Sequence, residues 1–278
     1  MYHNFAKPGG AWQVRRVMHV EQLVASNGGP CLELYSTPGA ICPLFTTPTS
    51  PTTIHHRRPL NPGTQMEEQA QSLLATLRKS SVPIETKLAA FNTLKSSIKH
   101  LRVPENSQTA IFECIKLAVS SQTSPTLVST GFSTLGHLIK RLSLQEQTSI
   151  IASQANKLLP ILLDRLGDPR ESHRNAASQT LSDLWPYSHT EVEKTVREGA
   201  IAGHNSRAKE MGMLWVVKVR THPYQQIIGA CLTLPLLQMN RDQGLQFRSF
   251  VPHLVACLED SDGGVRETAK SAVVELFR

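Results

Sequence analysis

Apolar residues recur at intervals of three and four positions along the chain from Met66 onward, a pattern that predicts a series of amphipathic α-helices. In the helix expected after Pro83, for example, Leu88, Phe91 and Leu94 fall on one face. Short stretches rich in Ser, Gly, Pro and Asp interrupt the pattern and predict turns that join the helices in pairs. These turns are expected near Ser80–Pro83, Ser121–Ser124, Gly167–Arg170, Gly203–Ser206 and Asp260–Gly263.

Two of the predicted helical hairpins match each other without a gap. The segments Leu158–Trp185 and Phe250–Phe277 align at an offset of 92 residues, with Pro, Leu, Asp, Arg and Ala at equivalent positions. A single helical hairpin cannot bury its apolar face alone, so repeated hairpins predict stacking into a solenoid. The sequence therefore predicts an all-α fold, an α-solenoid of about five HEAT-like helix pairs over residues 66–278.

Each copy of the repeat carries an Asp in its turn and an Arg six residues later. Asp168 and Asp260 are predicted to be N-cap residues, whose carboxylates accept hydrogen bonds from the first amides of the second helix. Pro160 and Pro252 are predicted to lie within the first helix of their pairs and to bend it. This combination resembles HEAT repeats. The resemblance implies a structural ladder between stacked repeats, formed by Asp168, Arg174, Asp260 and Arg266.

Residues 1–65 differ from the rest in being rich in Pro, Gly, Thr and Ser, with no sustained helical period. Such a segment does not bury enough apolar surface to offset the entropy of ordering. We interpret it as a disordered low-complexity tail or as a gene-model extension upstream of a true start at Met66. A transit peptide is a third interpretation, because Arg15 and Arg16 stand among few acidic residues.

A second unusual segment, residues 220–238, has two prolines, no acidic residue and no helical period. Arg174, Arg207 and Arg266 occupy equivalent repeat positions, separated by 33 and then 59 residues. The second interval exceeds a HEAT-like period of about 40 residues, and removing residues 220–238 would restore it. The segment is interpreted as a translated, unspliced intron, and the alternative is a long loop between repeats.

Composition limits the class of protein further. The 278 residues carry 29 Lys and Arg against 22 Asp and Glu, a formal net charge of +7. This mild excess suits an acidic protein partner and falls short of a nucleic-acid-binding stripe. The five cysteines lack metal-site spacing and predict reduced thiols of an intracellular protein, with Cys114 and Cys257 in the core. No apolar run reaches the roughly 20 residues that span a bilayer, so no membrane association is expected.

No catalytic motif is present, so the chain is not expected to be an enzyme or to bind a cofactor. His55 and His56 have no neighbouring carboxylate or thiol, and no metal site is predicted. The remaining histidines considered are expected at helix ends and surfaces, without ligand spacing: His100, His137, His173, His189 and His204. Trp185 and Trp215 end apolar helical patterns and are predicted to be core residues.

Functional interest therefore falls on the turns within the helix pairs, which line up along one edge of a solenoid. Basic residues follow several of these turns, where they can meet an acidic partner. Lys209, in the string NSRAKEMGMLW, is the preferred contact candidate, whereas Arg174 and Arg266 are assigned to the internal ladder. The complete set of predicted partner-binding residues is Val82, Lys87, Arg170, Arg207, Lys209 and Lys270.

Four strings carry a more specific resemblance. They are GFSTLGHLIKRL (131–142), LGDPRESHRNAASQTLSDLWP (166–186), NSRAKEMGMLW (205–215) and FRSFVPHLVACLEDSDGGVRETAKSAVVELF (247–277). Together they resemble the first TOG domain of fungal CLASP proteins, over residues 66–219 and 239–278. The resemblance implies an array of HEAT repeats that holds αβ-tubulin or the microtubule lattice through its turns. It also implies stabilisation of dynamic microtubules, a role in the mitotic spindle, and localisation to cytoplasm, cytoskeleton, spindle and nucleus.

The chain departs from that family pattern in two respects. The first turn, Ser80–Val82, lacks the aromatic residue of many tubulin-binding TOG domains, so Val82 is left to supply the apolar contact. The sixth repeat and the later regions of a CLASP protein do not follow Arg278, which suggests a fragment or truncated gene model. The alternative function is a HEAT scaffold for another partner, such as a kinetochore protein, a transport cargo or a regulated enzyme, with little tubulin affinity. A nucleic-acid-binding solenoid is the less favoured third reading.

Overall fold

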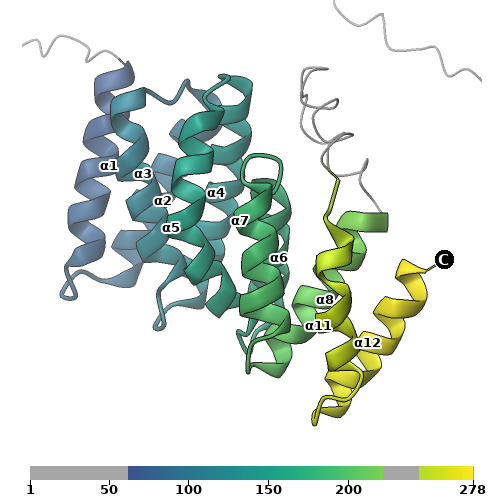
Figure 1. Ribbon diagram of the computed structural model, residues 1–278. Helices are drawn as coiled ribbons and strands as arrows, with labels where there is room; N and C mark the ends of the chain where they lie inside the picture. The colour runs from purple at the N-terminus through teal and green to yellow at the C-terminus, as the bar shows by residue number, and fades with distance from the viewer. Residues whose placement is uncertain (1–61, 222–243, 278) are drawn as a thin grey trace, which may run out of the picture. The chain divides into compact units, whose positions relative to one another are not determined.

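The computed structural model describes residues 62–221 and 244–277, and within these ranges every regular element is a helix. Figure 1 shows the helices standing side by side in succession along the chain. The elements are α1 (Pro62–Arg78), α2 (Ile84–His100), α3 (Glu105–Val119), α4 (Pro125–Leu144), α5 (Thr148–Leu166), α6 (Glu171–Leu184), α7 (His189–Lys194), the π-helix η1 (Thr195–Ile201), α8 (Ser206–Thr221), the 3₁₀ helix η2 (Phe247–Ser249), α11 (Val251–Cys257) and α12 (Gly263–Leu276).

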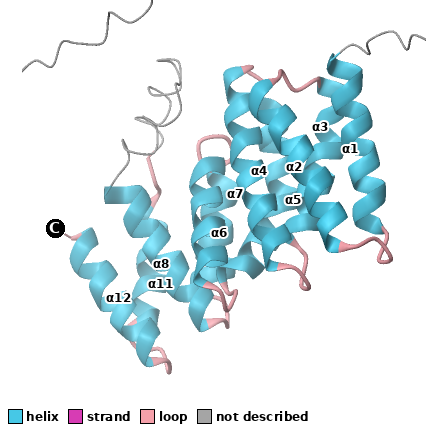
Figure 2. Cartoon of the chain, turned by 180° about the vertical axis from the view of Figure 1, so that it is seen from behind, coloured by secondary structure: helices cyan, strands magenta, loops and turns pink. Residues whose placement is uncertain are grey.

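The helices form successive antiparallel pairs that stack in two layers. Within the pairs, α1 packs on α2, α3 on α4, α5 on α6, η1 on α8, and α11 on α12. The first helices contact one another in the order α1, α3, α5, η1 and α11, and the second helices in the order α2, α4, α6, α8 and α12. Figure 2 shows the same succession from behind. The predicted α-solenoid of HEAT-like helical hairpins is therefore confirmed.

A continuous apolar core lies between the two layers, because each helix presents one apolar stripe to its neighbours. Its largest fully buried side chains include Trp215, Phe91, Phe112 and Phe250. Cys114 and Cys257 are buried free thiols, as predicted. Burial raises the pKa of Cys114 to about 12, so this thiol stays protonated and unreactive.

The core prediction for the two tryptophans holds fully for Trp215 and only in part for Trp185. Trp215 is 0% exposed, whereas Trp185 is half-buried at the end of α6. The indole N–H of Trp185 donates a 2.9 Å hydrogen bond to Oε1 of Glu193, whose side chain is itself buried. The other carboxylate oxygen of Glu193 accepts from the amide of Gln246. Glu193 therefore connects the end of the third pair to the start of the fifth.

The first helix of the fifth pair is shorter than the sequence predicts. The apolar pattern continues upstream of Val251, but residues 247–249 form a 3₁₀ turn and α11 begins only at Val251. Pro252 consequently lies in the first turn of α11. Amides in the first turn of a helix make no hydrogen bond within the helix, so the missing amide of proline disrupts nothing there, and the predicted bend at Pro252 is wrong. Pro160 does lie inside α5, on an exposed side of that helix.

Two predicted boundaries also shift. Helix α1 begins at Pro62, before Met66, and α8 continues to Thr221, so Arg220 extends a helix that was expected to end at Val219. The guanidinium of Arg220 stacks over the ring of Phe247 at 4.6 Å from its centroid. Residues 1–61 and 222–243 lie outside the described residues, and with them most of the predictions for 1–65 and 220–238.

Candidate protein-interaction site

The turns within the helix pairs lie along one edge of the stack, at the bottom of Figure 1. Each turn joins the C-terminus of a first-layer helix to the N-terminus of a second-layer helix. The N-termini of α2, α4, α6, α8 and α12 therefore meet this edge, and each brings the positive end of a helix dipole. We call this surface the turn edge. Its backbone favours negatively charged partners before any side chain is considered.

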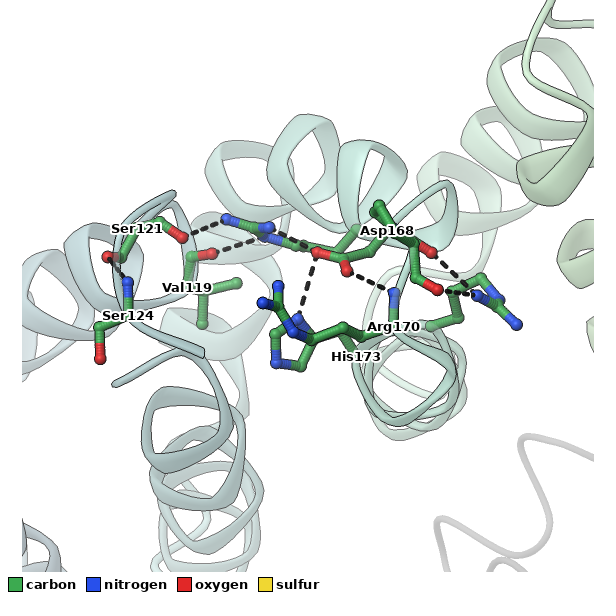
Figure 3. A network of polar contacts seen from close by, with 9 residues as sticks. Val119, Ser121, Ser124, Asp168, Arg170 and His173 are labelled. Carbon is green, nitrogen blue, oxygen red and sulfur yellow. Dashed lines mark hydrogen bonds and ion pairs between the residues drawn. The ribbon is translucent and has the colours of Figure 1, made fainter. Parts of the chain in front are cut away.

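The second and third turns are held together by Arg165, a buried residue in the last turn of α5. Its Nε donates to the carbonyl of Val119 at 2.8 Å, and its Nη2 donates to the carbonyl of Ser121 at 2.7 Å. Its Nη1 donates to Oδ2 of Asp168 at 2.6 Å, in an ion pair whose side chains are 8% and 3% exposed. Figure 3 shows Asp168 at the centre of this network, between the second turn and the start of α6.

Asp168 is the acceptor on which this network converges. The backbone amide of Arg170 donates to Oδ1 at 2.9 Å, and Nδ1 of His173 lies 3.2 Å from Oδ2. Burial alone would raise the pKa of Asp168, but the hydrogen bonds from Arg170, Arg165 and His173 outweigh it and lower the pKa to about 2. The carboxylate is therefore ionised and acts only as an acceptor, which places the proton of the His173 ring on Nδ1. His173 is buried, so its predicted surface position is wrong.

The predicted N-cap roles of Asp168 and Asp260 are also wrong. The N-cap of α6 is Arg170, and the N-cap of α12 is Asp262, whose carboxylate accepts from the amides of Gly264 and Val265. Asp168 and Asp260 instead lie two residues earlier, where each accepts from the amide two positions ahead, at 2.9 Å in both turns. These are Asx turns, in which the side chain shapes the entry to the helix rather than capping it.

The connections between repeats include the two acids of the predicted ladder, Asp168 and Asp260, but not its two arginines. Arg174 donates to the carbonyls of Asp168 and Pro169, and Arg266 donates to those of Asp260 and Ser261, so both close their own turns. The repeats are connected by Arg165, described above, and by Lys209 of α8, which forms an ion pair with Asp260. Arg165 and Lys209 therefore take the role that was predicted for Arg174 and Arg266. Lys209 had been predicted to contact a partner, and no role had been predicted for Arg165.

Contacts continue from the third turn to the fifth. Gly167 lies so close to Asn205 that a Cβ added to it would stand 2.3 Å from Nδ2 of the asparagine. Asn205 in turn caps α8, because its Oδ1 accepts from the amides of Arg207 and Ala208. Hydrogen bonding by Ser206 lowers the pKa of Asp262, and the hydrogen bond from Lys209 lowers the pKa of Asp260. The second to fifth turns are thus fixed relative to one another by side-chain contacts.

The predicted partner-binding residues differ in what they can offer a partner. Arg170 and Arg207 are exposed at the third and fourth turns, and neither guanidinium has a hydrogen-bond partner among the described residues. Val82 is half-buried in the first turn. Lys87 donates to the carbonyl of Leu77 at 3.5 Å, near the end of α1.

Lys209 and Lys270 are already engaged within the chain. Lys209 pairs with Asp260, and Lys270 pairs with Glu267 at 2.7 Å on the exposed side of α12, beyond its first turn. The geometry therefore favours Arg170 and Arg207 as contact residues. Lys209, which was the preferred candidate from the sequence, is less available because it already forms an ion pair.

Two features of the turn edge were not predicted. Arg78 and Lys79 are exposed at the first turn, but they precede it, whereas the predicted contact residues follow their turns. The fifth turn is acidic, since Glu259, Asp260 and Asp262 lie within it. The charge along the turn edge thus changes from basic at the first turn to acidic at the fifth.

The described residues offer little support for other kinds of site. Residues 62–221 and 244–277 contain no group of three or more His, Cys, Asp or Glu side chains placed to hold a metal ion. Over the same ranges, no helix combines the length and the apolar character needed to cross a membrane.

Stacked helical hairpins with a fixed turn edge define a helical-repeat interaction module, a non-enzymatic kind of protein. Comparison with known families gives the particular group: the family model for the CLASP N-terminal region matches residues 66–278, and the chain belongs to that family. Protein STU1 of Phaeosphaeria nodorum is 50% identical over 212 residues, and protein stu1 of Aspergillus fumigatus is 46% identical over 212 residues. Each alignment covers 76% of this chain and 16% of the relative, so the chain spans about a sixth of the relatives' length.

Solved structures support the same fold. The crystal structure of the MAST/Orbit N-terminal domain superposes with a TM-score of 0.57 at 18% identity, over 74% of this chain and 82% of that one. A structure described as showing that TOG-tubulin binding specificity promotes microtubule dynamics and mitotic spindle formation has a TM-score of 0.55 at 16% identity. That likeness covers 77% of this chain and 76% of the other.

Proposed function

We propose that this chain is a tubulin-binding module whose turn edge contacts αβ-tubulin, as a free dimer or within the microtubule lattice. Membership of the CLASP N-terminal family and the fold shared with a TOG domain studied for tubulin binding support this proposal. The observation that carries it is the geometry of the turn edge. Five helix N-termini meet one surface, and Arg170 and Arg207 are exposed on it without internal partners among the described residues.

Charge confines the contact to part of the turn edge. An acidic partner is attracted by the helix N-termini and by the exposed cations of the first, third and fourth turns. The fifth turn opposes it, because Asp260 and Asp262 hold carboxylates with lowered pKa values that stay ionised at neutral pH. In our proposal the partner therefore lies across the first four turns, with Val82 as the apolar contact of the first.

The activity of the longer protein is part of the same proposal. In view of the CLASP N-terminal family and the TOG–tubulin structure, we place the chain in a protein that stabilises dynamic microtubules, associates with the cytoskeleton and acts in forming the mitotic spindle. Spindle or kinetochore proteins are proposed as further partners, with the protein present in the cytoplasm and, during division, at the spindle within the nucleus.

A binding assay with charge reversal tests the proposal. The full chain is mixed with free αβ-tubulin for gel filtration, and with taxol-stabilised microtubules for co-sedimentation. Arg170→Glu with Arg207→Glu is expected to weaken binding at least about tenfold, since two attractive contacts become repulsive. The control is Lys157→Glu, which reverses one charge at an exposed position of α5 away from its turn and is compared with Arg170→Glu and Arg207→Glu made singly.

The result also separates the proposal from its main alternative. If the unaltered chain binds neither free tubulin nor microtubules, the module is a HEAT scaffold for another protein. If it binds but the double variant and the Lys157 control behave alike, tubulin is the partner and the turn edge is not the contact surface.

A further inference from the structure

Two neighbouring helices carry positive charge that few acidic residues of their own offset. Helices α2 and α4 together contain five Lys and Arg residues, and their one acidic residue is Glu85 in the first turn of α2. Residues 66–278 as a whole carry 24 basic and 20 acidic residues, a net charge of +4. Helix α8 is also basic, with four Lys and Arg residues and one Glu, and acidic residues elsewhere in the helical region offset its charge.

The charges on α2 and α4 are brought together by the stacking of the second layer, in which these helices are in contact. Lys95 and Lys99 lie one turn apart on α2, so they share a face, as do His137 and Arg141 on α4. Arg141 Nε donates to the carbonyl of Ile98 at 3.2 Å, and its Nη2 also bonds to the carbonyl of Lys99. These contacts fix the C-terminal half of α4 beside the lysines of α2. Figure 2 shows α2 and α4 as neighbours on this side of the molecule.

The resulting basic patch consists of Lys95, Lys99, His137, Lys140 and Arg141. Its position is distinct from the turn edge, because these residues lie in the C-terminal halves of α2 and α4, whereas the turns lie at their N-termini. Lys99 is exposed and Lys95 is half-buried, and neither has an ion-pair partner among the described residues. Burial, together with the charges of Lys95, Lys99 and Lys140, lowers the pKa of His137.

Part of this charge has a purely structural explanation. Cations near helix C-termini are stabilised by the helix dipole, and Arg141 also caps carbonyls at the end of α2. That explanation does not extend to the crowding of lysines on both helices, since like charges at such spacing repel and reduce stability. An external anion bound beside Lys95 and Lys99 would relieve this repulsion.

We propose that the basic patch on α2 and α4 binds an acidic peptide segment of a partner protein, at a site separate from the turn edge. The dimensions fit an extended chain. Lys95 and Lys99 are about 6 Å apart along the helix axis, and carboxylates on one side of an extended peptide repeat about every 7 Å. The axis of α4, which carries Lys140 and Arg141, lies about 8–10 Å away across the helix contact. Duplex nucleic acid fits less well, because strong binding to it requires about 6–10 phosphate contacts.

Fluorescence anisotropy with a labelled peptide of ten consecutive glutamates tests this inference on the full chain. Lys95→Glu with Lys99→Glu is expected to weaken binding of the peptide at least about tenfold, and more at low salt than at high salt. Lys95→Gln with Lys99→Gln is the second variant, which removes charge without adding repulsion and is expected to weaken binding less. Arg170→Glu with Arg207→Glu, at the turn edge, is expected to leave peptide binding unchanged.

His137 supplies a direct readout at the site. Saturation with the peptide is expected to raise the pKa of the His137 imidazole, measured by NMR titration, because a bound anion offsets the lysine charges. An unchanged pKa, or equal peptide affinity in the Lys95/Lys99 variants, would overturn the proposal. It would also be overturned if a short DNA duplex or phosphatidylserine vesicles bound through the same lysines more tightly than the peptide. Since the turn-edge variants are separate, this inference and tubulin binding can fail independently.

Discussion

Replacing Arg165 with Met should reveal how much the link between the second and third turns contributes to the fold. Met keeps most of the apolar stem and removes three charged hydrogen bonds, to Val119, Ser121 and Asp168. The main loss is at Asp168, whose side chain is 3% exposed and would remain ionised without its guanidinium partner. Removing one member of a buried ion pair costs about 3–5 kcal/mol, a large fraction of the roughly 5–15 kcal/mol that stabilises a typical domain.

Equilibrium urea denaturation of the full chain, followed by far-ultraviolet circular dichroism, measures this loss. Arg141→Met is the matched control: Arg141 also donates to carbonyls of a neighbouring helix, but no carboxylate is among its bonded partners. We expect the control to cost only about 1 kcal/mol, the net value of ordinary hydrogen bonds.

A double-mutant cycle isolates the ion pair itself. Asp168→Asn keeps the shape and the acceptor for the Arg170 amide, so combining it with Arg165→Met removes the stranded charge. The double variant should therefore lose less stability than the sum of the single losses, by about 2 kcal/mol. Additive losses, or an Arg165→Met variant no less stable than Arg141→Met, would show that the network contributes little.

Three further predictions concern individual turns. The pKa of Asp168 is about 2, below its ordinary value near 3.8. The stability that the ionised Asp168 contributes should therefore be complete above about pH 4 and disappear as the pH falls toward 2. Asp168→Asn should flatten that part of an acid-unfolding curve. Asp262→Ala should lower the melting temperature because α12 loses its N-cap, and Asp262→Ser should restore most of it. Glu146, at the end of α4, has φ of 60°, so Glu146→Gly should stabilise the chain by about 0.5–1 kcal/mol, whereas Glu146→Ala should not.

The helices and their pairing were predictable because both depend on local sequence. Each helix has its apolar residues at helical spacing, and each turn is marked by residues that interrupt that spacing, such as Pro83, Gly167 and Asn205. The fifth pair shows where local patterns mislead. Apolar residues continue upstream of Val251, but they form a 3₁₀ turn, in which Phe247 is stacked by Arg220 and packs edge-on against Phe277. Those contacts come from residues distant in sequence, which periodicity does not represent.

The roles of charged residues were less predictable, for a physical reason. A basic residue in the last turn of a helix, such as Arg165, is most simply explained as complementing the helix dipole. Its contacts to Val119 and Ser121 depend on how α5 stacks on α3, which no local pattern reports. The Asp residues of the turns were correctly predicted to be structural, but not which role each of them has. An N-cap and an Asx turn both use an Asp, and the two positions are only two residues apart. In the string DSD, the choice between Asp260 and Asp262 depends on where α12 begins.

These assignments imply that the two charged surfaces act by different physics. At the turn edge, Asp168 and Asp260 neutralise Arg165 and Lys209 internally, so what remains there is short-range: exposed guanidinium groups and helix N-termini whose effect falls off within about one turn. On α2 and α4 the charge is uncompensated by acidic residues of those helices beyond Glu85, so its field extends about a Debye length, roughly 10 Å at 0.1 M salt. In our proposals, Arg170 and Arg207 therefore act on tubulin at direct contact, whereas the patch on α2 and α4 acts on an acidic segment at longer range. The two surfaces are separable in this fold because their residues lie at opposite ends of the second-layer helices.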